Sequence, residues 1–266
     1  MKKLYVCADI EGTCGIAAWD ETERFKPGYA PFARQMSREV AAACEGALEA
    51  GMDEVLVRDA HDSALNIEWE HLPRQAKLIR GWAQDPYCMM SGLDGSFYGA
   101  VLTGCHDAAG TGSNPLSHTM DTGIAWMECN GERLSEARLN AYTAAGAGVP
   151  VLAVTGDEGV CARMQELIPA LRTAGVSAGV GNSSRSIHPD LAVELIRDAV
   201  REACLAPRED FLLRLPERFR LDIRYVKHAS AYKAGFYPGM RRLDSHTLRF
   251  ETDAWDEALR MMLFCL

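Results

Sequence analysis

The sequence lacks the segments that would place a chain in or across a membrane. It has no apolar run of 18 residues, so no transmembrane helix is predicted. Two lysines near the N-terminus precede an apolar run of only Leu4 to Ala8, and Asp9 follows at once. Such a run is too short for a signal peptide. We therefore expect a cytoplasmic protein with no membrane partner.

Paired cysteines and basic runs are also missing. The nine cysteines are an odd number and include no CxxC pair, which favours reduced thiols over a disulfide framework. Lysine and arginine never occur in a run longer than two, and the net charge is −9. A phosphate backbone is a poor partner for such a chain, so we expect no nucleic-acid partner.

Several short catalytic motifs are absent as well. His71 in EWEHLP has no second histidine at the HExxH spacing, so a zincin helix is excluded. No GxSxG occurs, which argues against a serine α/β-hydrolase. Gly110-Thr111-Gly112 and Gly179-Val180-Gly181 are only fragments of glycine-rich loops, so nucleotide binding is not indicated.

Strand and helix patterns alternate through the first two thirds of the chain. This alternation predicts an α/β fold with a mixed, mostly parallel sheet flanked by helices. Asn130-Gly131 is a strong hairpin signal. We expect strands at Lys3 to Ile10, Glu54 to Arg58, Ala76 to Ile79, Ala100 to Gly104, Thr122 to Cys129, Glu132 to Leu134 and Val149 to Thr155, and helices at Pro31 to Ala50, Ser135 to Ala145, Gly159 to Leu167 and Pro189 to Cys204.

The pattern changes near residue 207. We predict a catalytic α/β domain over residues 1–206 and a smaller α+β portion over 207–266, with a single domain over the whole chain as the alternative. The C-terminal portion alternates apolar and polar residues, like half-exposed antiparallel strands, and closes with an amphipathic helix. The expected elements are strands at Phe211 to Leu215, Phe219 to Lys227 and Thr247 to Glu251, and a helix at Ala254 to Leu266.

Five residues with metal-binding side chains follow predicted strands in distant segments of the chain. In an open α/β sheet the carboxyl ends of strands share one edge, where ligands bind. Two imidazoles and three carboxylates at such an edge suit one or two divalent metals of the zinc type. A single acidic residue after a strand is usually only a turn or cap residue, so the prediction depends on all five together. They are Asp9, Glu11, His61, His106 and Glu136.

Neighbouring residues leave alternatives open. Asp9 and Glu11, two apart at a strand end, are expected to point to the same side, and Asp9 could bridge two metals. Asp59 is either a further ligand or a carboxylate that orients an imidazole. Asn140 lies one helical turn after Glu136, where it could support it. The neighbouring cysteines Cys7, Cys14 and Cys105 are expected to be buried small hydrophobic residues rather than ligands.

Five segments resemble, in order, the zinc-dependent D-aminopeptidase family of the DppA type, known from a dipeptide transport operon. They are CADIEGTCG, EVLVRDAH, GLDGSFYGAVLTGCH, LSHTM and EARLNAY-x7-PVLAVTGD. The resemblance implies two zinc ions per subunit, held by the five residues above. It also implies that His118 is catalytic, whereas the sequence by itself favours a loop histidine. Cys7 departs from the family pattern, which typically has serine there.

The resemblance completes the functional prediction. It implies an aminopeptidase that removes the N-terminal residue of short peptides by a metal-activated water, with D-residue peptides such as D-Ala-D-Ala preferred. It also implies a homodecamer of two stacked pentameric rings. Two rivals stay open: a binuclear metal phosphoesterase, for which Arg58 and Arg185 are the only basic residues near strand ends or motif loops, and a non-catalytic peptide- or metal-binding module.

Overall fold

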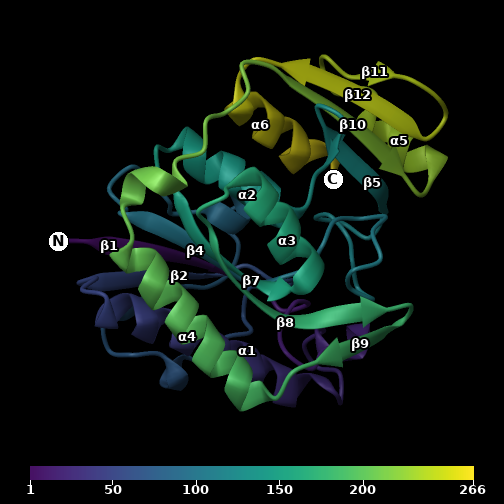
Figure 1. The fold of residues 1–266 in the computed structure, drawn as a ribbon. Helices are drawn as coiled ribbons and strands as arrows, with labels where there is room; N and C mark the ends of the chain where they lie inside the picture. Colours follow the sequence, from purple (N-terminus) through teal and green to yellow (C-terminus); the bar gives the residue numbers. More distant parts are fainter.

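The computed structural model describes residues 1–266 and has a seven-stranded sheet at its centre (Figure 1). Six strands are parallel, and only the edge strand β9 is antiparallel to its neighbour. The order across the sheet is β3 (Ala76–Ile79), β2 (Glu54–Asp59), β1 (Lys3–Ala8), β4 (Gly99–Cys105), β7 (Val151–Asp157), β8 (Arg172–Val180) and β9 (Ser183–Ser186).

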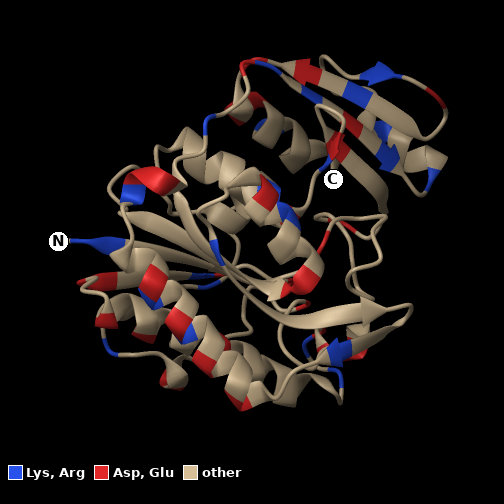
Figure 2. Ribbon diagram, viewed as in Figure 1, with Lys and Arg blue, Asp and Glu red and all other residues tan.

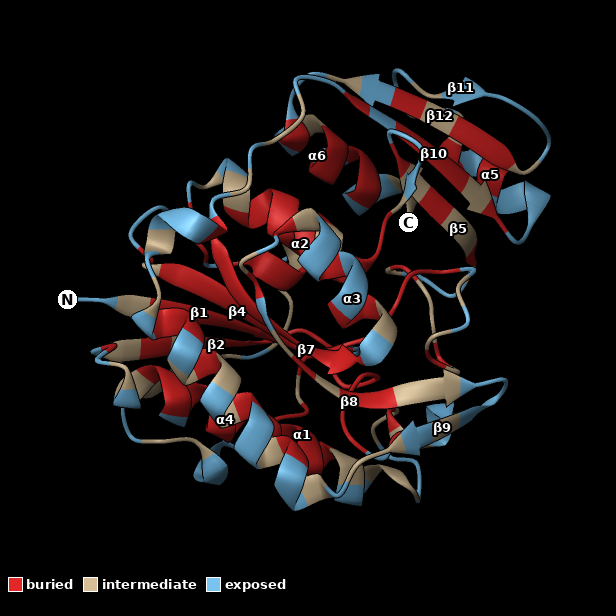
Figure 3. Cartoon of the chain, viewed as in Figure 1, coloured by how far each residue is buried: buried red, intermediate tan, exposed pale blue.

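Helices cover both faces of this sheet. One apolar core joins the sheet to α1 (Tyr29–Glu49) and α4 (Pro189–Leu205), and a second core joins the opposite face to α2 (Glu136–Gly146) and α3 (Glu158–Leu167). Figure 3 shows the central strands buried along most of their length. Continuous apolar runs are typical of parallel strands that are covered on both sides.

A second, antiparallel sheet lies beyond α2. It packs on α6 (Trp255–Cys265), whose Trp255 ring lies 5.2 Å from that of Tyr142 on α2. Figure 2 shows acidic and basic residues interspersed on its strands. Asp222 and Arg249, on adjacent strands, form an ion pair. The strand order is β11 (Arg241–Arg242), β12 (Thr247–Thr252), β10 (Phe219–Tyr225), β5 (Ile124–Cys129) and β6 (Glu132–Arg133).

The predicted fold class is confirmed, and so is the hairpin between β5 and β6. Asn130 and Gly131 both have positive φ, of 54° and 90°, which a two-residue hairpin turn of this kind requires. Because β5 and β6 precede residue 206, the second sheet is not built from residues 207–266 alone. The domain division near residue 206 stays a prediction.

The predicted strand at Phe211 to Leu215 is wrong. Arg208–Phe211 forms a 3-10 turn, and the residues after it join no sheet. Phe211 is fully buried in the core beneath α4. The apolar residue that suggested a strand is therefore a single side chain packed into the core, and the segment is not pleated. The pattern missed β8, β9 and β11, and also α5 (His228–Ala234), which are rich in small or polar residues. None of the helices is both long and apolar enough to cross a membrane.

Candidate metal centre

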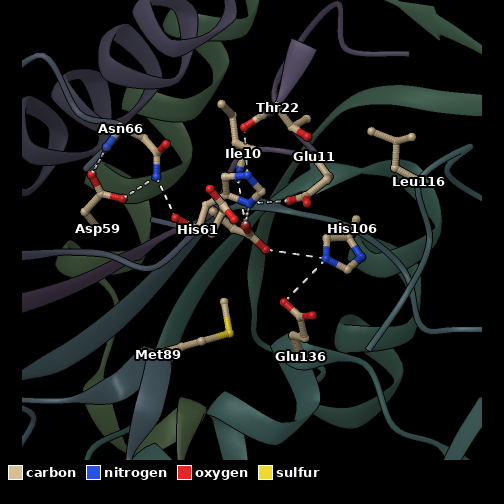
Figure 4. Close-up of polar contacts among 12 residues, drawn as sticks. Ile10, Glu11, Thr22, Asp59, His61, Asn66, Met89, His106, Leu116 and Glu136 are labelled. Atoms are coloured by element: carbon tan, nitrogen blue, oxygen red, sulfur yellow. Dashed lines mark hydrogen bonds and ion pairs between the residues drawn. The ribbon is translucent and has the colours of Figure 1, made fainter. Parts of the chain in front are cut away.

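Side chains from three neighbouring strands meet at the carboxyl edge of the main sheet. Asp9 directly follows β1, His61 lies two residues beyond β2, and His106 directly follows β4. The three strands are adjacent in the order β2-β1-β4, so their ends bring these side chains together. Glu136 comes from elsewhere, as the first residue of α2. Figure 4 shows Glu11, His61, His106 and Glu136 converging on one place.

Glu11 reaches this place through a tight turn. Strand β1 ends at Ala8, so the expected strand pleat does not explain why Asp9 and Glu11 point the same way. The turn is tied to β4, because the Gly12 amide donates to the Gly104 carbonyl at 2.8 Å. A Cβ atom at Gly12 would lie 1.9 Å from the Cys105 carbonyl oxygen, so this approach requires glycine.

His61 has a fixed orientation. Its Nε2 lies 3.0 Å from the Thr22 carbonyl oxygen, which can only accept, so Nε2 carries the proton. Nδ1 is then the nitrogen that is available to a metal ion, and it lies 3.2 Å from both Asp9 Oδ1 and Glu11 Oε2. A carbonyl that fixes the imidazole tautomer in this way is typical of metal-binding histidines.

His106 is oriented in the same manner with its nitrogens exchanged. Nδ1 lies 3.0 Å from the Asp107 carbonyl oxygen, which leaves Nε2 directed at Asp9 Oδ2 at 3.5 Å and Glu136 Oε2 at 3.4 Å. The side chain is completely buried, yet Nε2 makes no hydrogen bond. Buried polar atoms are seldom left unpaired, so a ligand for Nε2 is expected.

The charges in this cluster shift one another strongly. Burial and the Glu11 charge raise the pKa of Asp9 well above its usual range. Burial favours neutral histidine, but the carboxylates outweigh it and raise the pKa values of His61 and His106 well above the ordinary value. Burial likewise opposes ionisation of Glu136, yet His106 lowers its pKa to about 2. The cluster therefore holds protons that a bound cation would displace.

His118 lies over the cluster on a loop. Its ring stacks on that of His106, with 4.1 Å between centroids and 11° between planes, and Trp19 meets it edge-on at 5.3 Å. Nδ1 lies 2.9 Å from the Leu116 carbonyl, so Nε2 faces the carboxylates of Glu11 and Glu136 at 3.9 and 3.6 Å. His118 remains partly exposed, unlike His106 beneath it.

The cluster forms the floor of a cavity of about 870 Å³. This volume suits a ligand the size of a short peptide. The walls come from loops, including those that carry Trp19, Trp82 and Met89. Six carboxylates line the cavity, and no lysine or arginine does; the acidic residues are Asp9, Glu11, Glu23, Asp62, Asp121 and Glu136.

The donor atoms fit divalent metal ions. Three groups of three residues each place their ligand atoms within 4.8 Å of one another. Two of them share Asp9 and together contain all five predicted ligands, and the third joins Glu11 and His106 to His118. Mixed imidazole and carboxylate donors suit zinc. The unpaired buried atoms Glu11 Oε2 and His106 Nε2 are directed into this cluster, which supports the fit.

Comparisons with known proteins agree along nearly the whole chain. Residues 1–264 match the family model described as D-aminopeptidase. The chain belongs to the D-aminopeptidase family. A D-aminopeptidase from Bacillus subtilis is 32% identical over 263 residues, which are 98% of this chain and 95% of the relative. A solved structure, the Zn-dependent D-aminopeptidase DppA from Bacillus subtilis, a self-compartmentalizing protease, superposes with a TM-score of 0.90 at 31% identity over 98% of this chain and 95% of that one.

Membership of the D-aminopeptidase family confirms the predicted family and the predicted class of peptide hydrolase. A binding module without activity does not fit this family. The phosphoesterase alternative also loses its basic residues: Arg58 is fully buried beneath Trp82, and Arg185 on β9 lies 3.5 Å from Glu158. Neither arginine lines the cavity.

Two residues that the sequence left open lie outside the cluster of this D-aminopeptidase. Asp59 accepts hydrogen bonds from the backbone of Asn66 and Ile67, and the Asn66 side chain binds the His61 carbonyl at 2.7 Å (Figure 4). Asp59 thus shapes the loop that follows His61. Asn140 Nδ2 contacts the sulfur atoms of Cys7 and Met89.

Sequence reasoning missed the groups that orient and cover the cluster. The Thr22 carbonyl fixes His61, and Trp19 contacts His118, but both residues belong to a single 3-10 turn (Trp19–Glu21, capped by Thr22), which is too short to show a periodic pattern. Because every residue has a backbone carbonyl, the identity of residue 22 gives no indication of its contact with His61. Trp19 is 37% exposed, and a large, partly exposed apolar side chain is the signal that the structure adds.

We predict that Asp59→Asn weakens zinc binding by about 10- to 100-fold, as is usual for residues that support a ligand. The Asn66 and Ile67 backbone amides both donate to Asp59 Oδ2, and the Asn66 side-chain amide donates to Oδ1. Asparagine would replace one of these oxygens by an NH2 group that faces a donor, so the loop after His61 shifts. A zinc-chelator competition titration measures the change. Glu70→Gln, an exposed change nearby, serves as the control and should bind zinc like the unmodified chain.

Proposed function

We propose that this protein is a zinc aminopeptidase that removes the N-terminal residue of short peptides, with D-residue peptides such as D-Ala-D-Ala as the substrate class. The observation that carries the proposal is the pair of three-residue groups that share Asp9 at the floor of the cavity. Family membership supports the peptidase activity, and the Zn-dependent relative supports the choice of metal.

Two zinc ions are proposed to bind through the five clustered residues. One site would use Asp9, Glu11 and His61, and the other Asp9, His106 and Glu136, with Asp9 common to both. Such a pair of ions lowers the pKa of a water molecule and polarises a carbonyl group. The groups that hold the imidazoles, the Thr22 and Asp107 carbonyls, keep the ligand nitrogens directed at the cluster.

His118 is proposed to act on the substrate. Its Nε2 faces the cluster from the cavity side, so it can donate a hydrogen bond to a carbonyl oxygen that becomes negative, or pass a proton to the departing amine. Stacking on His106 and the edge contact of Trp19 limit the motion of its ring. This restraint keeps Nε2 at one distance from a substrate on the cavity floor.

The charge of the cavity supports a peptide with a free amino terminus. An α-ammonium group is attracted by the carboxylates at the mouth, such as Asp62 and Asp121. A phosphoryl substrate would meet the same carboxylates and no lysine or arginine, although phosphoryl sites depend on such residues. The lining therefore favours peptide over phosphoester hydrolysis.

The test is release of free amino acid from D-Ala-D-Ala and from L-Ala-L-Ala by zinc-loaded protein. We expect cleavage of the D,D peptide that a chelator abolishes and added zinc restores. Cleavage of the L,L peptide alone would refute the proposed stereochemistry. No cleavage of either peptide by protein that holds two zinc ions would refute the aminopeptidase proposal.

Zinc binding should release protons and strengthen as the pH rises. The carboxylates raise the pKa values of His61 and His106, so the metal-free protein binds protons there at neutral pH that zinc must displace. These ion pairs stabilise the metal-free fold below the ordinary histidine pKa, and the contribution is lost as the pH rises through the raised values. Calorimetric titration in buffers of different ionisation enthalpy measures the release, and a pH-independent affinity would contradict it.

We also propose a cytoplasmic homo-oligomer, specifically a decamer of two pentameric rings. The related structure is described as a self-compartmentalizing protease, and large apolar side chains are exposed on the C-terminal portion of this chain, among them Tyr232, Phe236 and Phe264. Assembly would enclose the cavities and admit only small or extended peptides. Light scattering that gives a monomer alone would refute the decamer.

A further inference from the structure

A buried carboxylate outside the cavity has no basic partner. Glu39 lies in the middle of α1 and is 1% exposed. Its Oε1 accepts hydrogen bonds from the Cys14 amide and from Gln35 Nε2, both at 3.0 Å. Its Oε2 is buried and has no hydrogen-bond partner. Burying a carboxylate with one oxygen unpaired is energetically unfavourable, so core packing does not explain why a glutamate occupies this position.

The Cys14 amide is the far end of the turn that carries Glu11. The near side of this turn is held by β4, through the Gly12 amide on the Gly104 carbonyl, and by Asn114, whose side chain donates to the Glu11 carbonyl at 3.0 Å. Helix α1 supplies one hydrogen bond to this turn, from Glu39, beside the apolar core that Ile10, Cys14 and Ile16 share with the helix. The Glu39 carboxylate therefore adds a directional contact to apolar packing that has none.

The next residues of the same segment bind a second element. Cys14 Sγ lies 3.1 Å from the Ile187 carbonyl, and the Gly15 amide donates to Ser186 Oγ at 3.0 Å. Gln35, the other donor to Glu39, also binds the Pro189 carbonyl at the start of α4. The turn, α1 and the start of α4 thus meet around one carboxylate.

We propose that Glu39 is a positioning residue for Glu11: its carboxylate fixes the Cys14 end of the turn and so holds Glu11 in place for a metal ion. This inference rests on the proposed zinc site. It assigns Glu39 no contact with metal or substrate.

Burying the Glu39 carboxylate lowers the stability of the fold, and this allows a positioning role to be distinguished from a stabilising one. Burial raises the pKa of Glu39 to about 7, against the hydrogen bonds from Gln35 and Cys14, which lower it. The other ionisable groups whose charges act on it are the Cys14 thiol and Arg38, which pairs with Asp190 on α4. Because the folded pKa exceeds the ordinary value of 4.5, Glu39 lowers the stability of the fold as the pH rises from 4.5 to about 7.

The experiment compares Glu39→Gln and Glu39→Met in the full-length chain, with Glu45→Gln on the exposed side of α1 as the matched control. Three quantities are measured: the zinc dissociation constant, the melting temperature of the metal-free protein at pH 5 and 8, and hydrogen exchange of residues 10–16 without metal.

Glutamine keeps an acceptor for the Cys14 amide and removes the buried charge. We expect Glu39→Gln to melt at a higher temperature than the unmodified chain at pH 8, with zinc affinity largely retained. Methionine has no comparable acceptor, so Glu39→Met should exchange the Cys14 amide faster and bind zinc about tenfold more weakly. Its melting temperature at pH 8 should not fall by more than a few degrees.

Two outcomes would overturn the proposal. If both variants melt well below the unmodified chain at pH 8, Glu39 is a structural residue. If Glu39→Met exchanges and binds zinc like the Glu45→Gln control, Glu39 does not position the turn. Failure of the zinc-site proposal is recognised separately, because then the unmodified chain binds no zinc, while exchange in the metal-free protein still tests the contact between Glu39 and Cys14.

Discussion

Replacing Asp9 by asparagine is expected to cause a severe loss of activity through the loss of zinc. Asp9 belongs to both proposed three-residue zinc groups, and its two oxygens face different histidines: Oδ1 lies 3.2 Å from His61 and Oδ2 lies 3.5 Å from His106. An amide can offer only one oxygen and carries no charge. We therefore expect kcat/KM to fall by roughly 1,000-fold or more, about 4 kcal/mol of transition-state stabilisation.

The same substitution should leave the metal-free fold intact. Asp9 is buried beside Glu11, and both burial and that like charge raise its pKa, so removing the charge relieves an unfavourable interaction. Zinc content measured by mass spectrometry should fall below two ions per chain, while the metal-free melting temperature holds or rises. Asp198→Asn on the exposed side of α4 is the control. An Asp9→Asn protein that keeps two zinc ions and full activity would refute the bridging role.

The strand ends could be predicted because apolar runs mark buried parallel strands so clearly. Asp9, His61 and His106 follow such runs, and a sheet in which β2, β1 and β4 are neighbours brings them together. Glu136 was found by a less secure route, since it begins a helix and does not extend the parallel sheet. The position of Glu136 depends on the path of the chain through β5 and β6, and the local sequence pattern does not predict where that hairpin packs.

The rest of the site depends on contacts between distant irregular segments. Glu11 is directed by a glycine turn against β4, and Glu39 reaches that turn from the middle of a helix. On the sequence alone, Glu39 is one of many acidic residues at helical spacing and reads as exposed. Only its burial and unpaired oxygen distinguish it. The segment after Phe211 was likewise misassigned from the sequence, because the burial of this one side chain gives an apolar pattern like that of a strand.

His118→Ala is expected to separate catalysis from metal binding. If the two groups that share Asp9 hold the zinc ions, this variant keeps two ions per chain and loses about 100- to 10,000-fold in kcat, the usual contribution of a positioned acid or base. The KM should change less, because the cavity floor and walls remain. His71→Ala, which removes an exposed histidine paired with Glu68, should change neither quantity.

The geometry is also compatible with the opposite role, in which His118 is a zinc ligand. Glu11, His106 and His118 form a third group with metal-binding geometry, and His118 Nε2 lies 3.6 Å from Glu136. If His118 is a ligand, His118→Ala loses zinc together with activity, and excess zinc restores part of both. If it is catalytic, excess zinc restores nothing. Zinc content and kcat measured on the same preparation, with and without added zinc, therefore assign the role of this histidine.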